Sequence, residues 1–454
     1  MSRKSIKKIV DKETKKEFKP KRSDKYSRLR GMKDILFDEY KYWDLVVKKA
    51  TDLSTIYGFN HIDKQILEKL DLLERYTGKE TDIVSKEMYA FIDKSGDRVA
   101  LRPEATPGLV RAYIEHGMFN LPQPVKMFWL GPLFRHEKPQ SGRLRQFFQY
   151  DLEMFGDSSP VADVQLILIA YNFFSELQID AQIQINSIGC KECRAEYSKK
   201  LVEYYKERGK RAKLCVDCKK RFTKNPMRLL DCKEPVCQQI REDAPQIVDS
   251  LCDSCREHFI KVLEYLDELD IPYNLNPFLV RGLNYYNRTV FEVFAVNDEE
   301  SETDKRQSAL GGGGRYDELV ELMGGRPTPA CGFGIGIERV INKIKEKNIP
   351  IKEDRDNYIF IAQLGEQGKR KAFMLFEELR KAGFKVRQSF TKDSLKVQLE
   401  EADRIVAKYT LILGQKELLD GTIILRDMES GTQEVVDYKK IIFELNKRIE
   451  GNKN

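Results

Sequence analysis

Polar side chains that could bind a phosphorylated ligand recur at every second position of one short run. The odd positions are Arg143, Arg145, Phe147, Gln149, Asp151 and Glu153, and the even positions between them are largely apolar. Since side chains alternate between the two faces of a β-strand, the run predicts one polar and one apolar face. Guanidinium groups, an aromatic ring, an amide and carboxylates could together hold phosphate, stack a base and recognise a small polar molecule. A polar face that simply meets water is the alternative.

This strand has a predicted partner, because Arg135–Phe155 contains two strand-like runs around a polar loop with Pro139 and Gly142. A second candidate segment is Leu101–Arg111 (LRPEATPGLVR), which follows the run Thr81–Tyr89. Taken alone, its prolines mark only a turn that enters a helix.

A third candidate segment is Leu279–Phe291 (LVRGLNYYNRTVF), where Gly282 could be a bulge and the aromatic residues strand packing. Two glycine-rich runs follow, Gly311–Gly314 and Gly332–Arg339 (GFGIGIER). The second lacks the spacing of G-x-G-x-x-G, and no Walker lysine follows. Neither run therefore predicts a dinucleotide loop or a P-loop.

Eight of the nine cysteines form close pairs. The pairs are Cys190/Cys193, Cys215/Cys218, Cys232/Cys237 and Cys252/Cys255. Three pairs have the C-x-x-C spacing that brings two thiolates onto one tetrahedral ion, so the eight could form two Cys₄ zinc sites. Reduced, unligated thiols in a segment held by apolar packing are the alternative. The remaining Cys331 fits a small core residue.

The secondary structure expected from the sequence, which must position these residues, differs between segments of the chain. A helix is expected over Glu39–Tyr57. From about Cys190 to Ile271 the chain is helical, charged and Cys-paired, which indicates an insertion. Strand patterning resumes at Asn276–Phe294 and continues through the glycine-rich Leu310–Arg339, with an acidic hairpin tip at Asn297–Asp304.

Beyond the polar linker Lys347–Asp356, strands and helices alternate. The expected strands are Tyr358–Ala362, Lys385–Arg387, Tyr409–Leu413 and Thr422–Asp427, and the expected helices are Lys369–Ala382 and one near Lys396–Ala402. This order predicts an independent small α/β domain.

Composition limits the class of protein. A chain of 454 residues suggests two or three domains, and 41% hydrophobic with 33% charged residues is typical of a globular protein. No apolar run approaches the ~20 residues that span a bilayer. Residues 1–25 lack the apolar segment of a secretory signal and contain acidic residues unlike a transit peptide, so we expect a basic, disordered tail. A tail that adds contacts to nucleic acid is the alternative. The net charge of +7 is compatible with a polyanionic partner but does not identify one.

These segments together resemble one known family. Arg135–Phe155 resembles motif 2 of the class II aminoacyl-tRNA synthetases, and Gly332–Arg339 is similar to their motif 3. Leu101–Arg111 and Leu279–Phe291 resemble the runs that distinguish the histidyl-tRNA synthetases within that class. The resemblance extends from Tyr26 to Asn446. It departs at Ala105, where the family usually has Gly, and at Asn284, where Asp is common.

The resemblance implies a role for each matching residue. The expected catalytic residues are Arg135 and Arg281. The residues expected to bind ATP are Arg135, Glu137, Arg143, Phe147 and Arg339. The residues expected to bind histidine are Glu104, Ala105, Thr106, Gln149, Glu153, Tyr285 and Tyr286. Arg281 would be an additional cation at the α-phosphate, and Tyr286 would pair with Glu153 around the imidazole. The loop His136–Gly142 would meet the acceptor end of the tRNA.

The resemblance also implies an α+β fold. A class II antiparallel sheet flanked by helices is expected in a catalytic domain at 26–350, with a helical insertion at 187–271 and a C-terminal α/β anticodon-binding domain at 356–450. The implied reaction is the attachment of L-histidine to histidine tRNA through a histidyl-adenylate, with ATP and Mg²⁺. The implied protein is a cytoplasmic homodimer without a membrane segment.

Two other classes of protein compete with this interpretation. One is the non-catalytic regulatory paralogue of ATP phosphoribosyltransferase, which shares the catalytic fold. The run Arg281–Tyr286 and the C-terminal domain argue against it. The other is a nucleic-acid-binding module with a decayed active site. The joint presence of Glu104, Arg135, Glu153, Arg281 and Arg339 argues against that class.

Overall fold

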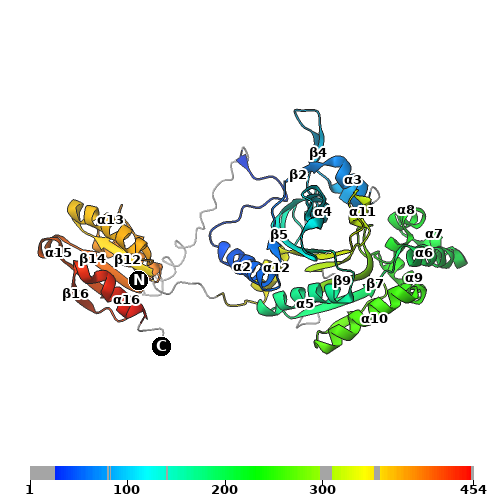
Figure 1. Cartoon of the computed structure of the whole chain (residues 1–454). Coiled ribbons are helices and arrows are strands. Elements are labelled where there is room, and N and C mark those ends of the chain that lie inside the picture. The colour runs from blue at the N-terminus through cyan, green and yellow to red at the C-terminus, as the bar shows by residue number, and fades with distance from the viewer. Residues whose placement is uncertain are drawn as a thin grey trace, which may run out of the picture. The chain divides into compact units, whose positions relative to one another are not determined.

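The computed structural model describes residues 26–78, 81, 83–139, 142–296, 309–351 and 358–450 (Figure 1). The expected tail at 1–25 and the acidic hairpin tip at Asn297–Asp304 lie outside these residues. Contacts divide the chain into two compact units, 1–349 and 350–454. No helix in the described part of the chain is long and apolar enough to cross a bilayer.

The first unit is built around an eight-stranded sheet. Its strands are β1 (Asn60–His61), β5 (Val125–Phe134), β6 (Gln146–Phe155), β7 (Ala181–Ser187), β8 (Tyr273–Leu275), β9 (Asn287–Ala295), β10 (Gly311–Arg315) and β11 (Ala330–Gly336). Their order in space is β1-β5-β6-β11-β10-β9-β7-β8. The six inner strands pair antiparallel with one another, and each edge strand is parallel to the strand beside it.

The two faces of strand β6 meet different helices. On the apolar face, Phe148 contacts Trp43 of α2 (Tyr40–Ile56) and Tyr150 contacts Phe173 of α5 (Pro160–Glu176). On the polar face, Glu153 meets Thr106, the first residue of α4 (Thr106–Glu115). Pro107 suits the first turn of that helix, where its missing N–H costs no hydrogen bond. The alternation along β6 therefore turns Glu153 away from α5 and toward α4.

A smaller sheet and a short helix precede α4 in the sequence. The strands β2 (Leu67–Lys69), β4 (Arg98–Leu101) and β3 (Ala90–Ile92) pair antiparallel in that order. Helix α3 (Leu70–Thr77) follows β2, and a π-helical turn covers Ile83–Glu87. Thr77, at the end of α3, lies within hydrogen-bonding distance of Glu104.

The insertion between β7 and β8 is helical, as predicted. Its main helices are α6 (Lys191–Lys206), α7 (Lys210–Lys213), α8 (Val216–Lys224), α9 (Pro235–Arg241) and α10 (Asp253–Glu268). Figure 1 shows them gathered beside β7 and β9. Apolar residues of α6 and α8, among them Tyr197 and Phe222, belong to the same buried cluster as Tyr285 and Tyr286.

The predicted strand at Asn276–Phe294 is wrong in its first half. Residues 276–286 are irregular, and β9 begins only at Asn287. Pro277 lacks the N–H that a ladder requires, and the Asn186 side chain binds the carbonyl groups of Pro277 and Leu279 instead. The segment Leu310–Arg339 is also not all strand, because helix α12 (Ile337–Glu346) begins inside it.

The second unit is an α/β domain with a five-stranded sheet in the order β13-β12-β14-β15-β16. Its strands are β12 (Tyr358–Gln363), β13 (Lys385–Gln388), β14 (Tyr409–Leu413), β15 (Thr422–Asp427) and β16 (Gln433–Asp437). Its helices are α13 (Gly365–Lys381), α14 (Leu395–Arg404), α15 (Gln415–Asp420) and α16 (Ile441–Glu450). The parallel strands β12 and β14 are buried along most of their length, which explains their continuous apolar sequences. The prediction omitted β16, α15 and α16.

Candidate active site

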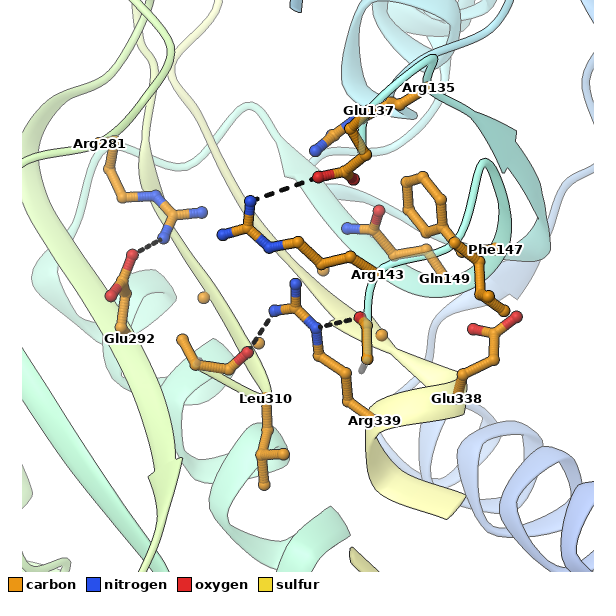
Figure 2. Close-up of a pocket in the computed structure, with 17 residues that line it drawn as sticks. Arg135, Glu137, Arg143, Phe147, Gln149, Arg281, Glu292, Leu310, Glu338 and Arg339 are labelled. Atoms are coloured by element: carbon orange, nitrogen blue, oxygen red, sulfur yellow. Dashed lines mark hydrogen bonds and ion pairs between the residues drawn. The ribbon is translucent and has the colours of Figure 1, made fainter. Parts of the chain in front are cut away.

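Four arginines converge on one pocket at the start of β6. Arg135 and Arg143 come from the β5–β6 connection, Arg281 from the loop before β9, and Arg339 from the first turn of α12 (Figure 2). The pocket is also lined by Glu137, Phe147, Gln149, Glu292, Glu338 and the glycines of β10 and β11. Segments almost 200 residues apart in sequence therefore build one arginine-rich surface, which we call the cationic pocket.

Each of these arginines is held by a different partner. The guanidinium of Arg135 donates to the Pro103 carbonyl at 2.8 Å and lies over the Phe147 ring. Arg143 lies 3.3 Å from the Glu137 carboxylate, and Arg281 lies 2.6 Å from Glu292. These contacts hold the positions of these three cations in the absence of a ligand.

Arg339 is the most constrained of the four. It donates to the backbone carbonyls of Gly142 at 3.1 Å and Ala309 at 2.5 Å. Burial lowers the pKa of Arg339, and the nearby charges of Arg143 and Arg135 lower it further. This electrostatic repulsion between like charges would be relieved by an anion in the pocket.

The glycines of β10 and β11 make room for the pocket's side chains. The register pairs Gly332 with Glu153 and Gly334 with Asp151. A Cβ at Gly332 would overlap the Glu153 carboxylate, and one at Gly334 would overlap the Gln149 amide. A Cβ at Gly312 would lie 2.7 Å from the Arg281 guanidinium. The glycine-rich sequence thus serves the packing of neighbouring polar side chains across three strands.

The second part of the site is a group of buried polar side chains around the carboxylates of Glu104 and Glu153, which we call the acidic pocket. Thr77 and Tyr285 donate to the two oxygens of Glu104 at 3.0 Å and 3.2 Å. Thr106 donates to one oxygen of Glu153 at 2.6 Å, and the Tyr316 hydroxyl donates to the other. Two carboxylates, each with two hydroxyl donors, could recognise a ligand that carries N–H groups.

Glu153 has a direct partner that the sequence did not identify, because the Tyr316 hydroxyl binds its carboxylate. The expected placement of Glu153 and Tyr286 around an imidazole stays a prediction. Tyr286 lies at the edge of the same aromatic group, with ring centroids 4.7 Å from Tyr285 and 6.4 Å from Tyr316. The Arg281 guanidinium lies over the Tyr286 ring, so Tyr286 adjoins the cationic pocket.

The acidic pocket contains groups that the sequence did not identify. Asp151 is buried, and its Oδ2 has no hydrogen-bond partner. Lys64 is also buried, with its ammonium 4.7 Å from the centre of the Trp129 ring. For these two groups, the only indication in the sequence was the position of Asp151 on the polar face of β6. Ala105, which was expected to bind histidine, is buried beside Trp129 in the core.

Burial dominates the electrostatics of this acidic pocket. It raises the pKa of Glu153 to about 8 and raises the pKa values of Glu104 and Asp151. The neighbouring carboxylates add to the rise for Asp151 and Glu153. Burial also lowers the pKa of Lys64 to about 8. The pocket therefore favours a ligand that brings positive charge or hydrogen-bond donors.

The insertion holds the loop that carries Arg281 and the two tyrosines. Arg228 donates to the Gly282 carbonyl at 2.9 Å, and Asn225 donates to the Asn284 side chain at 3.0 Å. Arg194 of α6 donates to the Tyr286 carbonyl at 2.7 Å. Asn284, which departs from the family pattern, thus contacts the insertion rather than the acidic pocket.

A groove with several basic side chains lies where the insertion meets the segment around residue 81. Its lining residues are Thr81, Ser85, Lys86, Asp217, Lys220, Arg221, Lys224, Asn225, Arg228 and Asn284. Asn284, which is among the lining residues, directly precedes Tyr285. The groove therefore adjoins the loop that carries Tyr285 and Tyr286.

The eight paired cysteines come together in two groups of four. Cys190 and Cys193 meet Cys252 and Cys255, whereas Cys215 and Cys218 meet Cys232 and Cys237. None of the cysteines forms a disulfide, and Cys331 is buried alone in the core. The sequence could not show which pairs share a group.

An antiparallel sheet that presents arginines beside an acidic pocket has the features expected for a class II aminoacyl-tRNA synthetase. Residues 31–340 match the family model described as histidyl-tRNA synthetase, and residues 349–448 match the one described as anticodon binding domain. The chain belongs to the histidyl-tRNA synthetase family.

Individual relatives agree with this membership. A protein named histidine–tRNA ligase from Thermosipho melanesiensis is 43% identical over 418 residues, covering 92% of this chain and 97% of the relative. The crystal structure of apo S. aureus histidyl-tRNA synthetase has a TM-score of 0.78 at 32% identity, covering 93% of this chain and all of the other.

One solved structure bears on the regulatory alternative. A protein from Bacillus halodurans, described as an ATP phosphoribosyltransferase regulatory subunit/histidyl-tRNA synthetase, has a TM-score of 0.60 at 18% identity. At that identity the likeness shows a shared fold alone. Because the chain shares 43% sequence identity with a protein named histidine–tRNA ligase and 18% with this one, the comparisons do not favour the regulatory paralogue.

Proposed function

We propose that this chain activates L-histidine with ATP and transfers it to histidine tRNA through a histidyl-adenylate. The observation that carries the proposal is the contact between the cationic pocket and the group of buried acidic residues. Arg281 lines the cationic pocket, and its guanidinium lies over the ring of Tyr286, which packs against Tyr285 and Tyr316. Histidine has an anionic carboxylate that suits the arginines, and an α-ammonium and an imidazole that suit the buried carboxylates.

The cationic pocket is the proposed ATP site. Phe147 offers a ring against which adenine can lie, and Arg135 already stacks on that ring at 5.2 Å. Arg143 and Arg339 would contact the phosphates, as planar guanidinium groups suit phosphate oxygens. Glu137 pairs with Arg143, which supports its assignment to the same site.

In the first step, a carboxylate oxygen of histidine attacks the α-phosphorus of ATP, and pyrophosphate leaves. The carboxylate is already a nucleophile, so the protein supplies position and charge. We assign this role to Arg135 and Arg281, which enter the pocket from β6's connection and from the 276–286 loop. Arg281 has a buried Nε without a partner, which supports a role for this side chain toward a ligand.

The acidic pocket is the proposed histidine site. Glu104, with Thr77 and Tyr285, would bind the α-ammonium, and Glu153, with Thr106 and Tyr316, would accept a hydrogen bond from the imidazole. Gln149 and Tyr286 lie between the pockets and would border the same ligand. An amino acid that lacks the imidazole donors would leave these buried groups unpaired, which can reject it by as much as ~10⁴.

The carboxylate oxygens that line the cationic pocket also suit a magnesium ion. Glu137 and Glu292 both line the cationic pocket beside their arginine partners. Mg²⁺ usually keeps several waters and binds through one or two carboxylates plus substrate phosphates. When bound, the ion would neutralise charge on the phosphate oxygens.

The tRNA is proposed to contact both units. The basic groove beside Asn284 would receive the acceptor end, together with the connection at His136–Gly142, because phosphate contacts favour Lys and Arg. The C-terminal unit would bind the anticodon, consistent with the family model that matches it.

We also propose a homodimer and a cytoplasmic location. Ile66, Leu67, Phe91 and Ile92 are exposed apolar side chains on or beside the small sheet, and a second copy could cover them. Nine cysteines without a disulfide suit a reducing compartment. Light scattering should give twice the mass of one chain; a single-chain mass would contradict the dimer.

ATP–pyrophosphate exchange tests the proposed activity. Each of the common amino acids would be supplied in turn, followed by charging of total tRNA. Exchange with histidine alone and charging of histidine tRNA are expected. If a folded protein shows no exchange with histidine, the proposal fails and the regulatory paralogue becomes the better account.

A further inference from the structure

The two cysteine groups in the insertion lie apart from the pockets described above and have no role in the proposed reaction. The first group is Cys190, Cys193, Cys252 and Cys255, and the second is Cys215, Cys218, Cys232 and Cys237. In each group all four sulfur atoms lie within 4.8 Å of one another. The first group joins the starts of α6 and α10, the first and last helices of the insertion, and the second lies between these helices in the sequence.

The spacing of the sulfur atoms matches coordination of a single ion. Sulfur atoms 2.3 Å from a tetrahedral zinc ion are about 3.8 Å apart along each edge. Cys215 and Cys232 are 3.8 Å apart, Cys190 and Cys252 are 4.0 Å apart, and Cys190 and Cys193 are 3.4 Å apart. A disulfide would bring two sulfur atoms to about 2.0 Å and separate them from the other two. The thiols therefore already surround a common centre.

The backbone supports thiolates at these positions. Cys190, Cys215 and Cys252 precede the first residues of α6, α8 and α10, and their C-x-x-C partners lie in the first turns. Backbone N–H groups point at the sulfur atoms, with Cys252 N 3.1 Å from Cys193 Sγ and Cys215 N 3.3 Å from Cys237 Sγ. Hydrogen bonds of this kind stabilise the ionised form of a ligand.

We propose that each group binds one structural zinc ion through four thiolates. Four ligands of one protein leave no open position, which is the arrangement of structural rather than catalytic zinc. Each thiol releases its proton as it binds, so the site becomes a dianion. Lys219, Lys220 and Arg221, which follow Cys218 directly, supply compensating charge near the second group.

The second zinc site would hold the loop that borders the active site. Asn225 and Arg228 follow α8, which directly follows Cys215, and these two residues bind the loop at Asn284 and Gly282. Arg228 is within the segment that Cys218 and Cys232 enclose. A zinc ion at this site would therefore fix the position of the segment between Cys218 and Cys232, from which Asn225 and Arg228 bind the loop that contains residues 282–286.

Metal analysis of the full chain tests the proposal. The protein would be purified under reducing conditions without a metal-affinity step, and zinc, iron and copper would be measured by mass spectrometry. Two zinc ions per chain are expected, one for each group. Less than one zinc ion per chain after exposure to zinc and removal of the excess would overturn the proposal, as would iron in its place.

Paired variants test which cysteines share an ion. Replacing two cysteines of one group, Cys190→Ser with Cys252→Ser, should reduce the content from two zinc ions to one. Replacing one cysteine in each group, Cys190→Ser with Cys215→Ser, should remove both ions. Cys331→Ser is the matched control and should keep both. Loss of one ion from the cross-group variant would contradict the grouping.

A titration of the unchanged protein does not depend on the folding of variants. An organomercurial added stepwise should release two zinc ions as eight thiols react, detected by a zinc-binding dye. Hydrogen exchange should then increase at 282–286 if the second site holds that loop. Thiols that react without releasing zinc would show that no metal was bound.

Discussion

The hydroxyl of Tyr316 donates a hydrogen bond to the buried carboxylate of Glu153, and these residues are 163 positions apart in the sequence. Glu153 lies on β6, and Tyr316 directly follows β10, two strands away. The Thr106 hydroxyl donates a hydrogen bond to the other carboxylate oxygen of Glu153 at 2.6 Å. Glu153 is thus oriented by two hydroxyl groups, and the proposed imidazole site depends on both.

Tyr316→Phe should weaken histidine binding while leaving the protein folded. The change removes one donor from a buried carboxylate, which costs about 1–3 kcal/mol, equivalent to a loss of ~5- to 150-fold in affinity. The KM for histidine in pyrophosphate exchange measures this effect. Tyr150→Phe is the matched control, because its hydroxyl binds Ser54 on the opposite face of β6. An equal effect of both variants would contradict a specific role for Tyr316.

Glu153→Gln should change how stability depends on pH. Burial raises the pKa of Glu153 from the ordinary 4.5 to about 8, so the folded protein keeps a proton that the unfolded chain loses between these values. The stability that this group contributes is therefore fully present below about pH 4.5 and is lost as the pH rises through about 8. Glutamine has no such proton, so the variant should gain in Tm relative to the parent as the pH rises.

Thermal unfolding at about pH 5 and about pH 8.5 measures this difference. Glu115→Gln, an exposed carboxylate on α4, serves as the control and should show no such gain. A Tm difference for Glu153→Gln that is the same at both pH values would contradict the raised pKa. Pyrophosphate exchange with histidine should be lost in Glu153→Gln at either pH.

The local pattern of the sequence was sufficient to predict much of the fold. The alternation from Phe147 to Glu153 predicted which residues share a face of β6, because that property depends only on the strand itself. Phe147 and Gln149 line the cationic pocket, and Glu153 meets Thr106. The strands Tyr409–Leu413 and Thr422–Asp427 were predicted to the residue for the same reason. The predicted fold class is confirmed.

Contacts between distant segments could not be predicted in this way. Tyr316 reaches Glu153 only because β11 lies between β10 and β6, an order that no local pattern specifies. Lys64 and Thr77 join the acidic pocket through the folding of a segment with no recognisable motif. The aromatic run at Tyr285 and Tyr286 resembled a strand, although Pro277 and the Asn186 side chain keep the preceding residues irregular.

Arg281→Ala should slow adenylate formation far more than it weakens histidine binding. The guanidinium lies at the meeting point of the two pockets and would stabilise charge that develops at the α-phosphorus. Removing one such group costs about 10²–10³ in kcat. Single-turnover measurement of adenylate formation, together with equilibrium binding of histidine, separates the two effects. Arg326→Ala, an exposed arginine stacked on Phe119, is the control. A pure binding defect would contradict the catalytic role.

Lys220→Ala combined with Lys224→Ala should impair charging of tRNA without affecting pyrophosphate exchange. Both residues line the same groove as Asn284, whereas neither lines the cationic pocket. Each lost phosphate contact should reduce the slope of log affinity against log salt by about 0.7–0.9, so the pair should reduce it by roughly 1.5. Lys199→Ala with Lys206→Ala removes the same charge from exposed positions on α6 outside this groove. If both double variants changed the KM for tRNA and the salt slope equally, net charge alone would explain the effect, and the groove would not be the path of the acceptor end.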